Sequence, residues 1–136
     1  MEYCEGFIVR ITRNDVLNRI YGQRTYFAEL RRDWSKGMKL MFMKKTHDID
    51  YCFIGSGIID SIIDTNKLNS LEKILCAKNN CYRKIIFGRL ARFYPSINVK
   101  QPKNGAWKSI ALLHGMHLGA SDIATIESLA VVSILS

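Results

Sequence analysis

Two histidines and two cysteines in the second half of the chain are the residues with the most specific possible chemistry. His114 and His117 are three positions apart and would share one face of a helix, and Cys76 and Cys81 are five positions apart. Imidazoles and thiolates bind zinc, but these spacings match no common zinc motif. We therefore expect no metal and no other cofactor, and we expect buried free thiols rather than disulfides.

Residues for acid–base or nucleophilic chemistry are sparse. Cys81 precedes Arg83 by two positions, and a nearby cation lowers a thiol pKa, while Asp48 and Asp50 could form a proton-transfer pair. The sequence contains no dinucleotide-binding fingerprint, no P-loop and no G-x-S-x-G motif. We assign no catalytic residue and favour a protein without catalysis of its own, although an enzyme remains an open alternative.

Positive charge is concentrated in one part of the chain. The net charge is +8, and the stretch from Lys73 to Gly119 holds nine basic residues and no acidic one. Seven of the nine lie within residues 79–110, with aromatic residues among them. Such a block indicates an anionic partner, with RNA or DNA as the first candidates. The alternative is the ordinary solvated side of a sheet.

Length and composition favour a single domain over residues 1–136. Of the 136 residues, 48% are hydrophobic and 24% are charged, which is typical of a folded globular protein. No apolar run approaches the roughly 20 residues of a membrane span, and the N-terminal stretch lacks the basic region of a signal peptide. We expect a cytoplasmic protein without membrane contact, as a monomer or a homodimer.

The residue pattern predicts strands joined mainly by hairpins. Strands or extended segments are predicted over 5–11, 24–31, 51–64 and 81–95. A further strand is predicted in the part of 34–45 that follows a turn at residues 35–37. Helices are predicted from 13 or 14 to 21, over 69–78 and over 119–135. Because hairpins join the long strands, we predict an α+β fold. It would be a curved, mostly antiparallel sheet or a small β-barrel, with flanking helices.

Several local signals refine the predicted helices. Thr12 with Asp15, and Asn69 with Glu72, have the spacing of a capping box, and Gly22 is expected to end the first helix. Apolar residues at helical spacing predict the buried faces of the later helices, namely Leu71, Ile74 and Leu75, and then Ile123, Ile126, Leu129 and Ala130.

The order of features in NRIYGQRTYFAELRRDWSKGMKLMFMKKTHDIDYCFIGSGIIDSI is a helix ending in glycine, basic residues, a lysine–glycine turn, an apolar strand, a hairpin and a further strand. This order resembles the PUA-like superfamily, which includes the PUA, ASCH, EVE and YTH domains and small archaeal relatives. The turn SKGMKLMFM is similar to their K-x-G-D-x-[ILV]-x-F segment, with Met38 in place of the acid. The later segments YRKIIFGRLARFYPSI and WKSIALLHGMHLGASDIATIESLA lie where EVE-like proteins have a strand, a tryptophan-led segment and a closing helix.

The resemblance implies that RNA, or a single modified or flipped base, is held in a cleft between the curved sheet and the helix after the first strand. Cations neutralise phosphates and aromatic rings stack on unpaired bases. We predict that the RNA-binding residues are Arg24, Arg31, Arg32, Trp34, Ser56, Lys100, Lys103, Trp107 and Lys108. The alternatives are core packing for the two tryptophans and a solvated face for the arginines.

Two other functions stay open. The ASCH-type motif G-x-K-x-x-E-x-R is approximated by Gly22, Arg24, Glu29 and Arg31, with the glutamate two places late. A hydrolase acting on a nucleoside or nucleotide would use Glu29 with Lys36 or Arg24 as its acid–base pair, and a closed pocket around Glu29 would favour it. The third candidate is a homodimeric interaction module whose apolar C-terminal helix, ending AVVSIL, pairs with a second copy.

Overall fold

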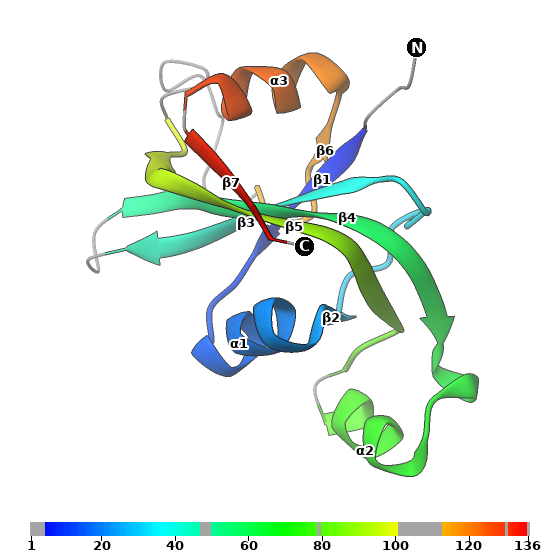
Figure 1. Ribbon diagram of the computed structural model, residues 1–136. Helices are drawn as coiled ribbons and strands as arrows, with labels where there is room; N and C mark the ends of the chain where they lie inside the picture. The colour runs from blue at the N-terminus through cyan, green and yellow to red at the C-terminus, as the bar shows by residue number, and fades with distance from the viewer. Residues whose placement is uncertain (1–4, 47–49, 79, 101–112, 130, 136) are drawn as a thin grey trace.

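The computed structural model describes residues 5–46, 50–78, 80–100, 113–129 and 131–135 (Figure 1). The elements follow the order β1 (Gly6–Arg10), α1 (Asn14–Gln23), β2 (Thr25–Ala28), β3 (Lys39–Thr46), β4 (Asp50–Asp64), a 3-10 helix η1 (Thr65–Lys67), α2 (Ser70–Lys78), β5 (Arg83–Asn98), β6 (His117–Leu118), α3 (Ala120–Ser128) and β7 (Val131–Leu135). None of the helices in these ranges has the length and apolar character needed to cross a membrane.

The strands form one curved sheet with the order β2-β5-β4-β3-β1-β6, and β7 also pairs with β5. Its strands pair in antiparallel fashion except β1 and β3, which are parallel. The predicted α+β fold with a mostly antiparallel curved sheet is therefore confirmed. The described strands form an open sheet rather than a closed barrel, with β2 and β6 at the two ends of the strand order.

Both faces of the sheet are covered, because side chains alternate in direction along each strand. Phe7 and Val9 of β1 belong to a core cluster that includes Ile20 of α1. Ile8, between them, belongs to a second cluster that includes Ile123 and Ile126 of α3. Figure 1 accordingly shows α1 and α3 on opposite sides of the sheet. The alternation in β1 thus decides which helix each residue packs against.

One glycine allows α1 to lie close to the sheet. The Tyr21 hydroxyl donates a hydrogen bond to the Ala91 carbonyl oxygen, with an O···O distance of 2.8 Å. A Cβ atom at Gly55 would overlap both of these oxygens. The β4–β5 register also shifts between Phe53 and Gly55, which bends the strand there. The register shift next to Gly55 in β4 therefore coincides with the attachment of α1.

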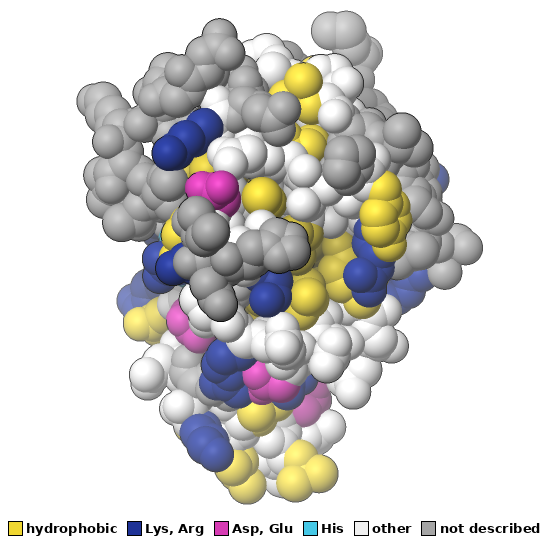
Figure 2. All heavy atoms as spheres, turned by 90° about the vertical axis from the view of Figure 1, so that its left-hand side faces the viewer, with side chains coloured by type: hydrophobic (Ala, Val, Ile, Leu, Met, Phe, Trp, Pro, Cys, Tyr) yellow, Lys and Arg dark blue, Asp and Glu magenta, His cyan; other side chains and the backbone are white. Residues whose placement is uncertain are grey.

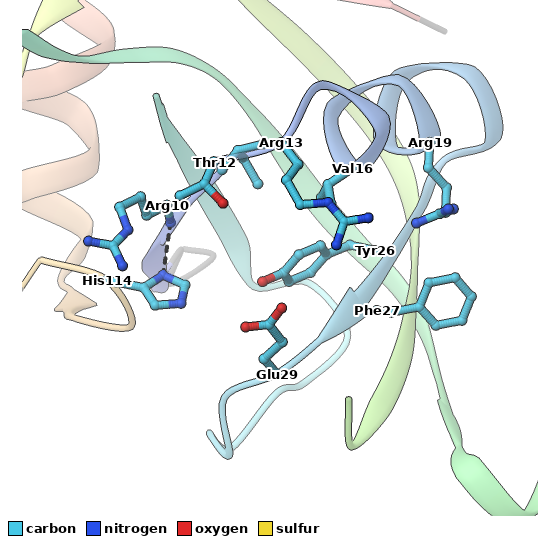
Figure 3. A pocket seen from close by; sticks show the side chains of 10 residues that line it. Arg10, Thr12, Arg13, Val16, Arg19, Tyr26, Phe27, Glu29 and His114 are labelled. Atoms are coloured by element: carbon cyan, nitrogen blue, oxygen red, sulfur yellow. Dashed lines mark hydrogen bonds between the residues drawn. The ribbon is translucent and has the colours of Figure 1, made fainter. Parts of the chain in front are cut away.

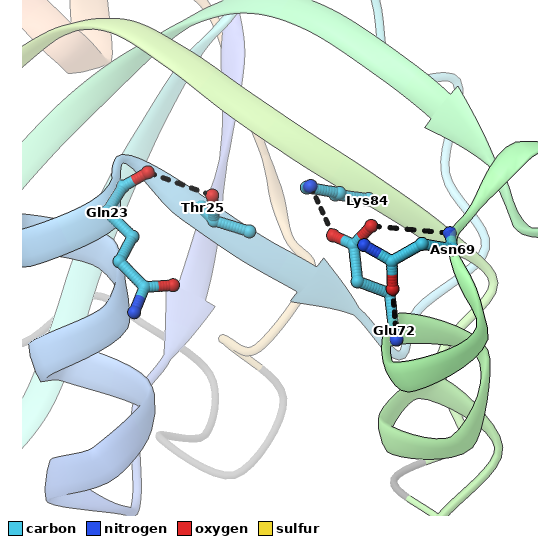
Figure 4. A network of polar contacts seen from close by, with 5 residues as sticks. All are labelled: Gln23, Thr25, Asn69, Glu72 and Lys84. Carbon is cyan, nitrogen blue, oxygen red and sulfur yellow. Dashed lines mark hydrogen bonds and ion pairs between the residues drawn. The ribbon is translucent and has the colours of Figure 1, made fainter.

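The two predicted capping boxes have different outcomes. In α2 the Glu72 backbone N–H donates to Asn69 Oδ1 over 2.8 Å, and the Asn69 N–H donates to Glu72 Oε1 over 3.4 Å (Figure 4). Lys84 of β5 forms an ion pair with the same glutamate. The prediction for α1 was wrong, because its N-cap is Arg13 and no side chain caps it. Asp15 instead accepts a hydrogen bond from Arg13 Nε, at 2.9 Å.

The end of the chain differs from the predicted long helix. The helix stops at Ser128, and residues 131–135 form β7, antiparallel to residues 90–94 of β5. Ile123 and Ile126 are buried as predicted, whereas Leu129 is exposed. The segment Val131–Leu135 is rich in β-branched residues, which pack well in strands, and it pairs along one side of β5. Pairing with β7 satisfies backbone groups along residues 90–94 of β5. These groups would lack this partner if residues 131–135 continued the helix.

The helix α2 also differs from expectation in two respects. Leu71 and Ile74 are 80% and 66% exposed, so the predicted apolar face does not pack against the core. The buried contact is made by Cys76 instead, which forms a disulfide with Cys81. The expectation of free thiols was therefore wrong for this pair, and neither thiol is available for the zinc alternative. The turn after α2 brings them together, since the Cys81 N–H donates to the Cys76 carbonyl oxygen over 2.9 Å.

Candidate functional site

Two hollows lie beside the segment that leaves β2. The first, which we call the inner cavity, has a volume of about 140 Å³, and its polar lining residues are Arg10, Thr12, Arg13, Arg19, Glu29 and His114. The second, the outer hollow, has a volume of about 590 Å³ and is lined by Arg31, Arg32, Asp33, Trp34, Tyr82 and Arg83 among others. Together we call them the basic cleft.

The inner cavity is formed where four parts of the chain meet. β1 ends at Arg10 and the chain passes through Thr12 into α1, while β2 supplies Tyr26 and Phe27 and is followed by Glu29. In Figure 3 the hydroxyl groups of Thr12 and Tyr26 and the carboxylate of Glu29 point toward a common space. The cavity therefore combines hydrogen-bond donors, a carboxylate acceptor and aromatic side chains.

His114 enters this cavity from the turn before β6. The backbone N–H of Arg10 donates a hydrogen bond to His114 Nδ1 over 2.9 Å, so Nδ1 is unprotonated. Burial lowers the pKa of His114 below 6.5, and the positive charges of Arg10 and Arg32 lower it further. The imidazole is consequently neutral at pH 7 and carries its proton on Nε2. That N–H is a donor at the edge of the cavity.

Burial and charge also set the state of two neighbouring groups. Burial raises the pKa of the Tyr26 hydroxyl, and the charge of Glu29 raises it further, so the phenol keeps its proton. The hydrogen bond to Asp15 raises the pKa of Arg13. The guanidinium of Arg19 lies 5.5 Å from the centroid of the Phe27 ring. The cavity wall thus presents permanently charged guanidinium groups beside a neutral phenol.

The outer hollow contains a paired arginine and tyrosine. The Arg31 guanidinium lies 4.1 Å from the centroid of the Tyr82 ring, which places a cation over an aromatic face. Arg32 Nε donates to the Gly115 carbonyl oxygen over 2.8 Å. Gly115 has φ 81°, and a Cβ there would lie 2.6 Å from Arg32 Nη2, so this turn requires glycine. Because Gly115 follows His114, this contact joins two chain segments that border the neighbouring hollows.

The predicted site residues occupy different places. Arg31 and Arg32 line the outer hollow together. Trp34 is only 5% exposed, packs edge-on against Phe7 with a centroid distance of 5.2 Å, and donates from Nε1 to the Leu30 carbonyl oxygen over 3.2 Å. Trp34 is nevertheless among the residues that line the outer hollow. The core-packing alternative therefore describes Trp34, and its ring offers no free face for stacking on a base.

Ser56 is also inaccessible, at 3% exposure. It pairs with Met41 of β3 on one side and Ala91 of β5 on the other, so this predicted RNA-binding residue lies within the sheet, where a ligand does not reach it. Arg24 Nη1 donates to the Gly88 carbonyl oxygen over 2.9 Å, and Arg24 lines neither hollow. Lys100 is exposed beyond the end of β5.

Three predicted RNA-binding residues, Lys103, Trp107 and Lys108, lie outside the described residues. Of the predicted acid–base pair, Glu29 lines the inner cavity, whereas Lys36 lies in the exposed turn before β3. Neither Lys36 nor Arg24 lines the cavity, so the pairing that sequence reasoning suggested for a hydrolase is not formed there.

The basic block of residues 79–110 does not form a single surface in the described part of the chain. Arg83 lines the outer hollow, Lys84 pairs with Glu72, and the Arg92 guanidinium lies 4.0 Å from the centroid of the Tyr21 ring. On the face seen in Figure 2, lysine and arginine side chains are spread over the surface with acidic side chains beside some of them. Charge density along the sequence was therefore a poor guide to charge density in space.

Sequence reasoning did not assign the basic residues of the inner cavity to the site, namely Arg10, Arg13, Arg19 and His114, although it considered His114 as a possible zinc ligand. A signal for three of them was present, because the resemblance points to the helix after the first strand, and these arginines end that strand, precede the helix and lie within it. His114 had no such signal, since it is more than a hundred positions away from Arg10.

Comparisons with known proteins identify the fold. No protein-family model matches the sequence, and no curated protein matches it at a significant level. A crystal structure of ASCH from Zymomonas mobilis is similar with a TM-score of 0.63 and 12% sequence identity, over 91% of this chain and 94% of that chain. The crystal structure of a tyrosine-to-phenylalanine variant of that protein is similar with a TM-score of 0.63 and 11% sequence identity, over 91% of this chain and 97% of that chain. The chain therefore has the fold of an ASCH domain, and the predicted PUA-like fold is confirmed.

Proposed function

We propose that this chain, which has the ASCH fold, is an RNA-binding domain that holds single-stranded RNA in the basic cleft. The observation that carries the proposal is the convergence of arginines from distant parts of the chain: Arg10, Arg13, Arg19, Arg31, Arg32 and Arg83 line the two neighbouring hollows. Guanidinium groups bind phosphate in bidentate fashion. A cleft several arginines long can follow successive phosphates of a strand.

The aromatic groups of the cleft support a single-stranded ligand. Tyr82 is 43% exposed, and Arg31 lies over its ring, so the pair presents a flat surface at the outer hollow. Unpaired bases stack on such surfaces, each contributing about 1–3 kcal/mol. A duplex keeps its bases stacked on one another, so this contact favours splayed, single-stranded bases. Tyr82 thereby takes the base-stacking role that the sequence suggested for Trp34.

The test is fluorescence anisotropy with a labelled unstructured RNA over a series of salt concentrations. We expect the affinity to fall steeply with salt, and the variant R19E/R31E to bind at least tenfold more weakly with a shallower salt dependence. The matched control K73E/K78E makes the same charge change on the exposed surface of α2, outside both hollows, and should bind more like the parent. Absence of RNA binding at low salt would refute the proposal.

A hydrolase acting on a nucleoside or nucleotide is the second candidate, and one observation favours it. Glu29 lines a small cavity together with His114, and a carboxylate beside an imidazole is a common acid–base combination. Mass spectrometry of RNA and nucleosides incubated with the protein would detect a product. Turnover by the parent protein that is lost in the variant E29Q would assign an enzymatic function to this cavity.

A further inference from the structure

We propose that the inner cavity selects guanine, with Glu29 as the specificity-determining residue. This inference rests on the proposed RNA-binding function and concerns which base the cleft admits. It begins from a carboxylate placed among cations: Glu29 lines a cavity that also contains Arg10, Arg13 and Arg19. A carboxylate repels phosphate, so its position in a phosphate-binding cleft calls for a ligand group that donates hydrogen bonds.

The groups of the cavity have a defined donor and acceptor pattern. The carboxylate group of Glu29 accepts hydrogen bonds, and Figure 3 shows it pointing inward. His114 accepts from the Arg10 backbone through Nδ1, so its other ring nitrogen, Nε2, carries the proton and is a donor. The cavity thus offers a two-oxygen acceptor and a neutral N–H donor to one ligand.

Guanine matches this pattern better than the other bases. Its Watson–Crick edge presents two adjacent donors, N1–H and the N2 amino group, which a carboxylate accepts in parallel, followed by the acceptor O6, which suits the N–H of His114. Adenine and cytosine offer the carboxylate one amino group, and uracil offers one N–H. Each of them therefore makes one fewer charge-assisted hydrogen bond to Glu29.

The size of the cavity is consistent with a single base. Its volume of about 140 Å³ is well below the roughly 300–1,000 Å³ of pockets for drug-sized ligands. Tyr26 and Phe27 contribute aromatic surface to its lining. Arg31 and Arg32 of the outer hollow follow Glu29 by two and three positions along the chain, so they are the candidates to contact the sugar and phosphate of such a base.

The experiment compares short oligouridine RNAs that carry one central G, inosine, A or C, or U throughout, by fluorescence anisotropy at fixed low salt. Inosine keeps N1–H and O6 and lacks the N2 amino group. We expect the G-containing RNA to bind most tightly and the inosine RNA about tenfold more weakly, the loss expected when one hydrogen bond to a charged group is removed.

Two variants identify the residue responsible. Glu29→Gln replaces one acceptor oxygen by an amide N–H₂, so the preference for G over inosine should disappear while oligouridine binding is retained. Asp60→Asn removes an exposed carboxylate of β4 outside both hollows and should keep the preference. Both variants should melt at the parent temperature, because both side chains are exposed.

The outcomes separate the two proposals. RNA binding of equal strength for all five oligonucleotides, or a preference that survives Glu29→Gln, would overturn guanine selection and leave the RNA-binding function standing. A complete absence of binding to every oligonucleotide would overturn both. A preference for cytosine that Glu29→Gln removes would assign the specificity to Glu29 but contradict guanine as the base.

Discussion

At the scale of single residues, His114 shows how burial and neighbouring charge set a protonation state. Its ring is half-buried, its Nδ1 accepts from a backbone amide, and Arg10 and Arg32 are the charged neighbours that disfavour a second proton. All three effects favour the neutral imidazole. The folded chain therefore resists a proton that the unfolded chain would bind readily.

This difference predicts a pH dependence of stability. The pKa of His114 is below 6.5 in the folded state, so the unfolded state binds more protons as the pH falls through 6.5, and the free energy of unfolding should decrease there. At pH values well above 6.5 the contribution of His114 to the free energy of unfolding is fully present. In His114→Asn, which keeps an acceptor near the Nδ1 position and does not titrate, this part of the decrease should vanish. Urea unfolding of both proteins between pH 5 and 7.5 measures the difference; equal slopes would contradict the assignment.

Trp34 illustrates a different residue-scale effect, because its burial converts a predicted binding residue into a structural one. Trp34→Ala should lower the free energy of unfolding by about 3–5 kcal/mol, as expected for a large aromatic side chain removed from a core. Tyr82→Ala, by contrast, should change stability much less and weaken RNA binding. Chemical denaturation of both variants tests this. A Trp34 variant that is as stable as the parent would show that the ring is not in the core.

At the scale of secondary-structure elements, the contact between α1 and the sheet determines whether the cleft can form. Arg13 precedes α1 and Arg19 lies within it, and their positions depend on the contact of Tyr21 with Ala91 above Gly55. Burial raises the pKa of Tyr21 to about 12, so its hydroxyl remains a donor throughout the physiological range. A substitution that moves α1 away from the sheet should therefore alter the cleft as well as the stability.

Two glycine substitutions should change the free energy of unfolding in opposite directions, one at the contact between α1 and the sheet and one away from it. Gly55→Ala would force the added methyl group into Tyr21 Oη and the Ala91 carbonyl, and we expect a loss of about 1–3 kcal/mol in the free energy of unfolding. Gly22→Ala, inside α1, meets nothing within 4 Å and should stabilise the protein by about 0.5–1 kcal/mol. Thermal and chemical denaturation give both values. A neutral Gly55→Ala would mean that α1 does not approach the sheet so closely.

At the scale of the whole molecule, β5 organises the architecture, since it pairs with β4 along much of its length, with β2 near its start and with β7 further along. The lower end of the molecule, where α2 lies, carries exposed hydrophobic side chains (Figure 2), and Leu71 and Ile74 belong to that helix. The C-terminal segment, which the sequence suggested as a dimerising helix, is instead part of the sheet.

Removal of β7 should therefore change the association state. A chain that ends before residue 131 leaves residues 90–94 of β5 without their strand partner, and an unpaired strand edge pairs readily with another chain. We expect the shortened protein to form dimers or larger species at concentrations where the parent does not change its state. Size-exclusion chromatography with light scattering compares the two. Identical elution of both proteins would show that β7 does not protect this edge.

Much of the fold could be predicted from local patterns. Alternating residues in β1 and β4, helical spacing in α1 and the Asn69–Glu72 capping box each act over a few neighbours, so they are visible in the sequence. The helix predicted over 119–135 was wrong in its last part, because pairing of residues 131–135 with β5 overrides helical spacing. The Cys76–Cys81 pair was missed because its formation depends on the turn after α2.

The sequence by itself determined that this chain is a basic, single-sheet α+β protein, because hydrophobic periodicity and net charge are properties of the residues in order. Only the tertiary structure decided which distant residues lie together. Arg10 donates a hydrogen bond to His114, and Arg32 donates one to Gly115, although the partners are 104 and 83 positions apart in the sequence. Such long-range contacts depend on the strand order and the curvature of the sheet, which local patterns do not specify. For the same reason Trp34 lies in the core while Tyr82 and Arg31 face the cleft.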